Sequence, residues 1–254
     1  MSADSGTCAG SASSSSPPLR IGMIGLDNSR VAAFARMLNE EGHPHRVPGA
    51  RLTAAWPGHP SPDFPLSCER LDGYVRELRD RQAVTMTDSL EETALHCDAW
   101  MLEAVDGRTR LELFERMVPF GKPIFVDKPF ALNSADAEAM SRLAADRGIP
   151  WMSCSALRFA EGLTSALEAE GEGNRLGADF YGPMPLEPTQ SDYFWYGIHT
   201  AEMLFRTLGP DCVGVRAFRT PEHDVAVGIW ADGRIGTIRG NRTGNEQFGG
   251  VLHG

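Results

Sequence analysis

The chain has 254 residues, of which 42% are hydrophobic and 23% charged, and its formal net charge is −10. This composition is typical of a folded globular protein with one or two domains. The negative charge and the lack of a basic run argue against a nucleic-acid partner. No run of about 18 apolar residues occurs, so we expect no membrane span.

The first 18 residues, MSADSGTCAGSASSSSPP, are rich in serine and contain no hydrophobic stretch. A signal peptide needs such a stretch, so this segment is predicted to be a disordered tail. The five cysteines are scattered and form no CxxC pair. This pattern argues against a zinc site or a disulfide framework, so we expect no bound metal and a reducing, cytoplasmic location.

After the tail, apolar runs of strand length alternate with amphipathic segments. The runs lie at 21–26, 52–56, 83–87, 99–102, 123–126 and 150–153. Helical segments are predicted over 29–41, after a capping box at 89–92, around 111–118 and over 134–147. Strands that alternate with helices predict an α/β fold with a doubly wound parallel sheet covered on both faces.

The pattern changes from residue 155 onward. Strands are predicted over 175–184, 213–219, 225–230 and 234–242, with a hairpin turn at 231–234. One helix is predicted at 198–208, where Gly209 ends it. This part therefore predicts an α+β domain built on a mainly antiparallel, open sheet.

The turn after the first strand, GLDNSR, lies where a dinucleotide-binding fold holds pyrophosphate. Gly25 matches the first glycine of a G-x-G-x-x-G template, but Asp27 and Arg30 stand at the second and third. Asp27 adds bulk and negative charge there, and Arg30 adds a charge-assisted donor that can offset them. Asn28 or Ser29 can cap the following helix.

A second cofactor signal is also missing. The strand at 52–56 is not followed closely by an acid that would bind the ribose hydroxyls, because Asp63 lies too far along the chain. The absence of this acid permits NADP, and it equally permits no cofactor. From these residues alone, a dinucleotide site and a plain strand–helix connection stay equally open.

The segment KPIFVDKPFA is a stronger signal, because it places Lys128 directly after an apolar strand. Pro129 disfavours a helical conformation in the residue before it, so Lys128 is held in a defined direction. The carboxyl ends of parallel strands line the ligand crevice of such sheets. A lysine desolvated there can donate to a substrate oxygen and has a lowered pKa. The alternative is a solvated lysine in a turn.

Three segments together resemble one family. RIGMIGLDNSRVAAFARML, GKPIFVDKPFALNSADA and YGIHTAEMLFRTLG are similar, in order and spacing, to the glucose-fructose oxidoreductase/inositol dehydrogenase (Gfo/Idh/MocA) family over residues 19–250. The DKP sequence corresponds to that family's EKP motif. The resemblance implies a Rossmann domain at 19–154 that binds NAD or NADP, and a domain at 155–254 whose open sheet forms a homo-oligomer. It also implies oxidation or reduction of a sugar, cyclitol or related polyol.

The family's second signature is an Asp followed, four residues later, by a His at the start of a helix. WYGIHTAE supplies His199 in the matching place, but Trp195 stands where the Asp is expected. Trp195 cannot accept a proton, although it can stack on a sugar face. Asp192 can substitute for the missing acid if the chain bends. Glu202, one helical turn after His199, can hold the imidazole in one tautomer.

Further residues complete the expected site. The cofactor-binding set implied by the resemblance is Gly25, Leu26, Asp27, Asn28, Ser29, Arg30, Glu103, Asp127 and Lys128. Glu103 follows the fourth strand, where it either lines the cleft or pairs with Lys128. Arg158 follows the sixth strand and is a candidate to anchor the substrate, the alternative being a link between the domains.

The resemblance thus implies a dehydrogenase in which Lys128 polarises the substrate oxygen and His199 is the general acid/base. The departures at Asp27, Arg30 and Trp195 keep a second hypothesis open, in which a non-catalytic or cofactor-altered relative binds a sugar-like ligand. The sequence ends on QFGGVLHG, where no strand or helix is predicted. A shortened form or a fragment, with exposed sheet edges, therefore also stays open.

Overall fold

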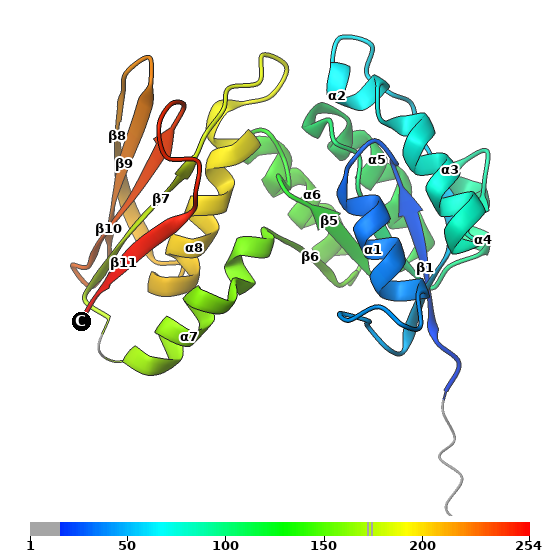
Figure 1. The fold of residues 1–254 in the computed structure, drawn as a ribbon, viewed down its shortest axis with the longest axis horizontal. Coiled ribbons are helices and arrows are strands. Elements are labelled where there is room, and N and C mark those ends of the chain that lie inside the picture. The colour runs from blue at the N-terminus through cyan, green and yellow to red at the C-terminus, as the bar shows by residue number, and fades with distance from the viewer. Residues whose placement is uncertain (1–15, 172, 174) are drawn as a thin grey trace, which may run out of the picture.

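A computed structural model describes residues 16–171, 173 and 175–254 of the chain. The predicted tail lies outside these residues except for its last three, which are exposed and have no regular secondary structure. The described elements form two sheets, each with its own helices, and the two parts lie side by side (Figure 1). In the described part of the chain, no helix is long and apolar enough to cross a membrane.

Sheet A is parallel throughout and confirms the predicted doubly wound sheet. Its strands are β1 (Leu19–Ile24), β2 (Ala50–Trp56), β3 (Thr85–Met86), β4 (Ala99–Leu102), β5 (Ile124–Asp127) and β6 (Trp151–Cys154). They are arranged in the order β3-β2-β1-β4-β5-β6, which reverses direction between β1 and β4. Ligands bind at this reversal in open α/β sheets, beyond the carboxyl ends of the strands.

Two hydrophobic cores cover the faces of sheet A. Its helices are α1 (Arg30–Asn39), α2 (Pro65–Cys68), α3 (Leu71–Gln82), α4 (Leu90–Leu95), α5 (Arg110–Met117) and α6 (Ser134–Asp146). Side chains of α1 and α3 form one core with β1 and β2, and those of α4, α5 and α6 form the other with β4 and β5. Apolar residues of the central strands point alternately to the two cores, which explains their continuous apolar character.

Most of the local signals around sheet A were correct, but not the second half of the capping box or the helices α2 and α3. The Ser89 hydroxyl accepts a hydrogen bond from the Glu92 amide at 3.0 Å, as predicted, but the Glu92 carboxylate accepts from the Asp88 amide and not from Ser89. Helix α3 was not predicted, because its sequence LDGYVRELRDRQ is strongly charged and buries only Leu78 and Gln82.

Sheet B confirms the mainly antiparallel second sheet. Its strands are β7 (Gly177–Pro183), β8 (Cys212–Arg219), β9 (His223–Trp230), β10 (Ile235–Asn241) and β11 (Gly249–His253), in the order β11-β7-β10-β9-β8. Only β7 and β10 pair in parallel. The expectation that no strand lies at 249–254 was wrong, since β11 pairs with β7 along the edge of the sheet.

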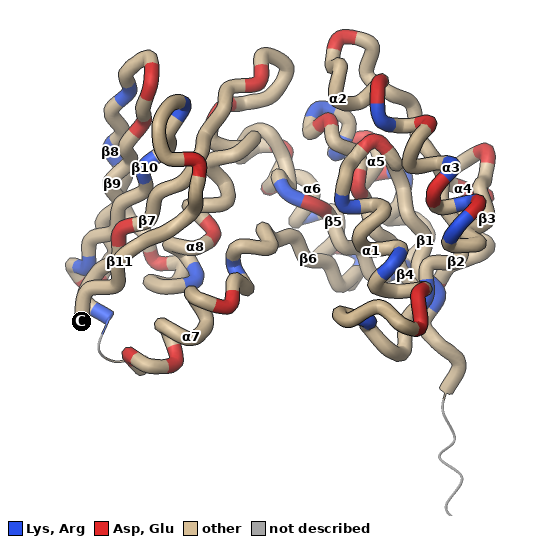
Figure 2. The backbone as a smooth tube through the Cα atoms, in the orientation of Figure 1, with Lys and Arg blue, Asp and Glu red and all other residues tan. Residues whose placement is uncertain are grey.

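Two helices accompany sheet B, and the first was missed from the sequence. They are α7 (Glu161–Glu170) and α8 (Ile198–Leu208), preceded respectively by a 3-10 turn (Ala156–Phe159) and a π-helical turn (Tyr193–Gly197). Helix α8 lies on the face of sheet B that is directed toward sheet A, and none of the described helices lies on the opposite face (Figure 1). Acidic and basic residues are interspersed over both parts (Figure 2).

Candidate functional site

The carboxyl ends of β1, β4 and β5 bring three predicted residues together. Ile24 is aligned with Leu102, and Leu102 with Val126, so Gly25, Glu103 and Asp127 occupy the next position on neighbouring strands. This edge lies at the point where the strand order reverses. The sequence therefore predicted correctly that these residues are neighbours.

Gly25 is required by the shape of the first turn. Its φ is +79°, and a β-carbon there would lie 2.6 Å from the backbone of Ala104. Its amide donates to the carbonyl of Trp56 at 3.0 Å, and the Leu26 amide donates to the carbonyl of Pro57 at 3.1 Å. The chain after β2 thus occupies the two amides that begin the turn, which leaves them unavailable to a phosphate.

Asp27 is buried and turned into the protein. One carboxylate oxygen accepts from the Val105 amide at 2.9 Å, and the other accepts from the Ser67 hydroxyl at 2.5 Å. Burial raises the pKa of this carboxyl, and the two hydrogen bonds partly oppose that rise. Asp27 therefore ties the first turn to the loop after β4 and to α2.

Asp127 organises the start of α1. Its carboxylate accepts from the Asn28 side-chain amide at 2.9 Å and from the Arg30 guanidinium at 2.8 Å. The Asn28 side-chain oxygen accepts from the Arg30 amide, so Asn28 and not Ser29 caps the helix with its side chain. Within the described residues, the backbone amides of Asn28 and Ser29 have no acceptor. They are the donors that this helix end leaves free.

Lys128 is buried, so the solvated alternative was wrong. Its side chain is 6% exposed, and its Nζ lies 3.5 Å from the Trp195 carbonyl oxygen. The ammonium also lies 5.0 Å from the centre of the Trp195 ring and 5.5 Å from that of Tyr196, within cation–π range. Burial, together with the Arg30 charge, lowers the pKa of Lys128 to about 8. The amine and ammonium forms are therefore both accessible near neutral pH.

His199 lies in the first turn of α8 and is also buried. Its Nδ1 is 2.6 Å from the Ser155 hydroxyl oxygen, and its ring centre is 5.1 Å from that of Tyr196. Burial, with the charges of Lys128 and Arg30, lowers the pKa of this imidazole to about 3. Tyr196 lies beside both side chains, so the fold brings Lys128 of the first domain and His199 of the second close to one aromatic ring.

Glu103 is fully buried, and neither carboxyl oxygen has a hydrogen-bond partner in the described part of the chain. The expected pairing with Lys128 is therefore not made. Burial and the neighbouring Asp127 charge raise the pKa of Glu103 well above its usual range. The protonated form of Glu103 is thus favoured over the carboxylate, and a buried orphan polar group of this kind needs a functional explanation.

The predicted substrate residues are occupied by protein contacts. Glu202 pairs with Arg158 at 3.2 Å and so does not orient His199; Ser155 contacts the imidazole instead. Asp192 pairs with Arg219 of sheet B at 2.6 Å. Trp195 is 8% exposed and packs edge-on against Phe64 at 5.6 Å, which leaves little of its face for a sugar.

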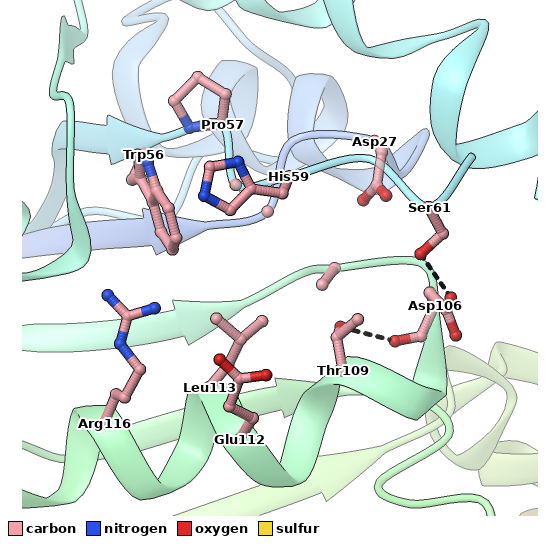
Figure 3. Close-up of a pocket in the computed structure, with 13 residues that line it drawn as sticks. Asp27, Trp56, Pro57, His59, Ser61, Asp106, Thr109, Glu112, Leu113 and Arg116 are labelled. Carbon is pink, nitrogen blue, oxygen red and sulfur yellow. Dashed lines mark hydrogen bonds between the residues drawn. The ribbon is translucent and has the colours of Figure 1, made fainter.

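Two cavities adjoin this site. The first, of about 100 Å³, lies between α5 and the end of β2 with the segment after it, and Asp27 is among the residues that line it (Figure 3). There the Ser61 hydroxyl donates to the Asp106 carboxylate at 2.6 Å, which links the segment after β2 to the segment before α5. The second, of about 310 Å³, lies beside Tyr196 and is lined mainly by Asn241, Arg242, Thr243, Asn245 and Glu246. Neither is lined by Lys128 or His199.

Ser155 and the polar loop at 241–246 were missed from the sequence. Ser155 carried a weak local signal, because a serine hydroxyl often caps a turn by accepting a hydrogen bond from the amide two residues later. Here that donor is the Leu157 amide. Its contact with His199 spans 44 residues and left no local signal. The polar loop also reaches Tyr196 only through the fold of sheet B.

No family model matches the sequence, and no curated protein matches it. Solved structures do. A putative myo-inositol dehydrogenase from Sinorhizobium meliloti 1021 superposes with a TM-score of 0.70 at 19% identity, over 93% of this chain and 73% of that one. GenD2 from gentamicin A biosynthesis, in complex with NAD, gives 0.71 at 18% identity over 98% and 73%. Apo scyllo-inositol dehydrogenase from Lactobacillus casei gives 0.71 at 16% over 94% and 73%.

The chain has the inositol dehydrogenase fold. At these identities the likeness concerns architecture, and it confirms the two-sheet fold that the resemblance implied. Function within this fold depends on the site residues, because one fold supports many activities.

Proposed function

We propose that this protein is an NAD- or NADP-dependent oxidoreductase that acts on a CH–OH carbon of a sugar, cyclitol or related polyol. The observation that carries the proposal is that Lys128, from the end of β5, and His199, from α8, are buried beside the same Tyr196 ring. Buried titratable groups with few partners are typical of proton-transfer sites. Neighbours with this fold include two inositol dehydrogenases and an NAD complex, which supports the assignment.

The start of α1 suits the diphosphate of such a cofactor. The free amides of Asn28 and Ser29 stand at the N-terminus of a ten-residue helix, with the Arg30 guanidinium beside them. A helix N-terminus favours an anion through its unpaired amides and its partial positive charge. Asp127 holds Asn28 and Arg30 in place for this role. When bound, the nicotinamide exchanges a hydride with the substrate carbon.

Binding of the adenosine end of the cofactor requires the segment after β2 to move. The cavity of about 100 Å³ next to Gly25 is smaller than the roughly 300–1,000 Å³ of ordinary ligand pockets. Because Ser61 closes it by donating to Asp106, we expect the segment after β2 to swing outward when the cofactor binds.

Lys128 is assigned the proton transfer. In the oxidation direction, the neutral amine of Lys128 would take the proton of the substrate hydroxyl and become the ammonium form. A bound oxidised nicotinamide would accept the hydride of the same carbon, which would become a ketone. A group with a pKa of about 8 is well matched to this role near neutral pH. His199, with a pKa of about 3, contacts the same oxygen as a neutral ring. The resemblance implied the opposite assignment, with His199 as the general acid/base and Lys128 as the group that polarises the oxygen.

The polar cavity beside Tyr196 is proposed to receive the part of the polyol that lies away from the reacting carbon, because Lys128 and His199 do not line it. Its side-chain amides, hydroxyl and carboxylate offer the mixed donors and acceptors that a polyol needs, and Tyr196 supplies an apolar wall. Arg158, Asp192, Trp195 and Glu202 are then supporting residues and not direct contacts.

Calorimetric titration of the full chain with NAD⁺, NADH, NADP⁺ and NADPH tests the proposal. We expect at least one to bind and to be turned over with an inositol or a sugar. Lys128→Ala should lower kcat by about 10²- to 10⁴-fold, and oxidation by the wild type should rise with pH through about 8. Failure of all four nucleotides to bind at millimolar concentration would overturn the proposal.

A second candidate is favoured by the occupied first turn. Because the amides of Gly25 and Leu26 are bonded and Asp27 is turned into the loop after β4, the protein is alternatively a binder of sugar-like ligands that needs no nicotinamide. Thermal stabilisation by an inositol in nicotinamide-free buffer would support this candidate. Turnover that disappears in both Lys128→Ala and His199→Ala would exclude it.

We also propose that the uncovered face of sheet B pairs two copies of the chain. Its exposed apolar side chains are Tyr181, Phe218, Ile229, Ile235 and Val251. Polar side chains, among them Asp179 and Arg239, lie between these apolar ones on the same face. Exposed large apolar side chains with polar neighbours are typical of an interface. Ile229→Lys should convert an oligomer to a monomer in light scattering, whereas Val215→Glu, exposed on the other face of β8, should not.

Two organisational expectations stay proposals. The domain boundary is placed between Cys154, where sheet A ends, and Ser155, which gives domains at 19–154 and 155–254. A cytoplasmic location is supported by the four described cysteines, which are all free.

A further inference from the structure

Ser155 connects two parts of the site. It follows β6 directly, is fully buried, and caps the 3-10 turn at Ala156–Phe159 by accepting a hydrogen bond from the Leu157 amide at 3.1 Å. On its other side the hydroxyl oxygen lies 2.6 Å from Nδ1 of His199. One hydroxyl thus joins the strand of sheet A to the helix of sheet B that carries the imidazole.

The hydroxyl proton has one acceptor available. A serine hydroxyl has one hydrogen to donate and two lone pairs, and the Leu157 amide takes one lone pair. If Nδ1 of His199 carried a proton, it would take the other lone pair, and the Ser155 hydrogen would have no acceptor among the described residues. An unsatisfied buried donor is costly. The arrangement that satisfies every group has Ser155 donating to Nδ1.

This donation decides where the ring proton lies. A neutral imidazole carries one proton, so an Nδ1 that accepts leaves the proton on Nε2. Nε2 has no protein partner among the described residues and is not sealed from solvent. The charged groups that face the ring, Lys128 and Arg30, are both positive and oppose a second proton. The ring therefore stays neutral.

We propose that Ser155 is a positioning residue that holds His199 as the Nε2–H tautomer, so that the ring offers its free nitrogen to the substrate oxygen as a hydrogen-bond donor and not as a base. The inference rests on the proposed function for its catalytic meaning, but the tautomer is a property of the free protein. A neutral donor at this place stabilises negative charge on the reacting oxygen and leaves the proton transfer to Lys128.

Ring nitrogen NMR of the full chain, labelled with ¹⁵N-histidine, tests the tautomer directly. The His199 signals are assigned by their loss in His199→Gln. We expect the wild type to show Nδ1 unprotonated and Nε2 protonated, unchanged between pH 5 and pH 9. A proton on Nδ1, or titration of His199 in this range, would overturn the proposal and needs no variant to detect.

Variants then test the role of Ser155. In Ser155→Ala we expect a mixture of tautomers and a raised pKa of His199, and Ser155→Thr should restore the wild-type ring spectrum because it keeps a hydroxyl. Ser153→Ala, two residues earlier in β6, is the matched control and should change neither. A ring spectrum and titration that are the same in Ser155→Ala and wild type would overturn the assignment.

Kinetics separate this inference from the proposed function. If the enzyme turns over a polyol, Ser155→Ala should lower kcat about tenfold with little change in KM, since the loss affects the reacting oxygen and not ground-state binding. If no nicotinamide is turned over but the Nε2–H tautomer is found, the proposed function fails and the role of Ser155 stands. If turnover is found with a proton on Nδ1, the proposed function stands and the role of Ser155 fails.

Discussion

The first turn and the Lys128–His199 pair lie at the same edge of sheet A, yet their polar groups are satisfied very differently. In the turn, the Asp27 carboxylate has two donors and the Asp127 carboxylate has two donors, all within 3.0 Å. In the pair, Lys128 has one long hydrogen-bond contact at 3.5 Å and two aromatic rings beside it. Among the described residues, the one hydrogen-bond partner of the His199 side chain is Ser155, and aromatic rings pack against the imidazole. The charged groups of the turn are thus saturated with hydrogen bonds, whereas the titratable groups of the pair are buried with few hydrogen-bond partners.

This difference shows which departures from the family pattern matter. A charged residue that is fully hydrogen-bonded inside the protein stabilises the fold and has little capacity left for a ligand. A charged residue that is buried with few partners costs stability and persists where its chemistry is used. Asp27 belongs to the first group and Lys128 to the second. The turn and the pair therefore predict opposite responses to mutation.

The largest contrast is expected from Lys128→Met. Because the pKa of Lys128 falls from 10.5 unfolded to about 8 folded, its burial costs about 3 kcal/mol while the unfolded chain remains fully protonated. Between pH 8 and 10.5 the unfolded state binds more protons at Lys128 than the folded state does, so the free energy of unfolding of the wild type rises with pH across this window. Lys128→Met should therefore be more stable than wild type at pH 7, with the gap closing toward pH 10.5, and should be inactive.

Chemical denaturation at several pH values, together with activity, measures this effect. Lys122→Met is the matched control, because the Lys122 ammonium donates to the carbonyls of Ala94 and Cys97 and its loss should destabilise. A Lys128→Met protein that is less stable than wild type at pH 7 would contradict the view of Lys128 as an under-partnered group.

Asp27→Gly should produce the opposite pattern at the turn. The change leaves the Val105 amide and the Ser67 hydroxyl without their buried acceptor, so we expect a loss of about 1–3 kcal/mol in the free energy of unfolding. It also removes a negative charge near the proposed diphosphate site, so nicotinamide affinity should rise about tenfold. Asp27→Asn, which keeps the shape but not the charge, separates the two effects. Unchanged affinity in both variants would place the diphosphate elsewhere.

Glu103→Gln tests the orphan acid between the two regions. The folded pKa of Glu103 lies well above its unfolded value near 4.3, so the folded state binds more protons in between. Wild-type stability should therefore fall as pH rises above about 4.3, by up to about 1.4 kcal/mol per pH unit, until the folded pKa is reached. Glu103→Gln should be free of this loss, whereas the exposed control Glu138→Gln should follow wild type. Parallel curves for Glu103→Gln and wild type would show that Glu103 is ionised in the fold.

The fold was largely predictable because its signals are local. Apolar runs, the Ser89 cap and Gly209 specified strands and helix ends within a few residues. The failures have physical causes. Helix α3 buries too few residues to show a clear apolar stripe. Strand β11 is a short edge strand that begins with two glycines, and its pairing with β7 is what reveals it.

The candidate residues could be selected from the sequence, but their partners could not. Lys128 and His199 were selected because they match the two family signatures and follow a predicted strand and begin a predicted helix. Which groups surround them depends on contacts between distant segments. Ser155, and not Glu202, contacts the His199 imidazole. Asp192 forms an ion pair with Arg219, and Phe64 packs edge-on against Trp195. None of these pairs is close in sequence, so no local pattern could specify them.

The smallest effect is expected at Arg158, and it decides whether a fully partnered residue can also serve the substrate. Its pair with Glu202 is partly exposed, so Arg158→Ala should cost less than about 1 kcal/mol of stability. Because the guanidinium is already engaged, we expect KM for the polyol to stay within about twofold of wild type. Glu202→Gln should give the same small loss, and the double variant no more than either single change. A rise in KM of tenfold or more in Arg158→Ala alone would instead make Arg158 a substrate anchor and would end the division between paired structural groups and unpaired functional ones.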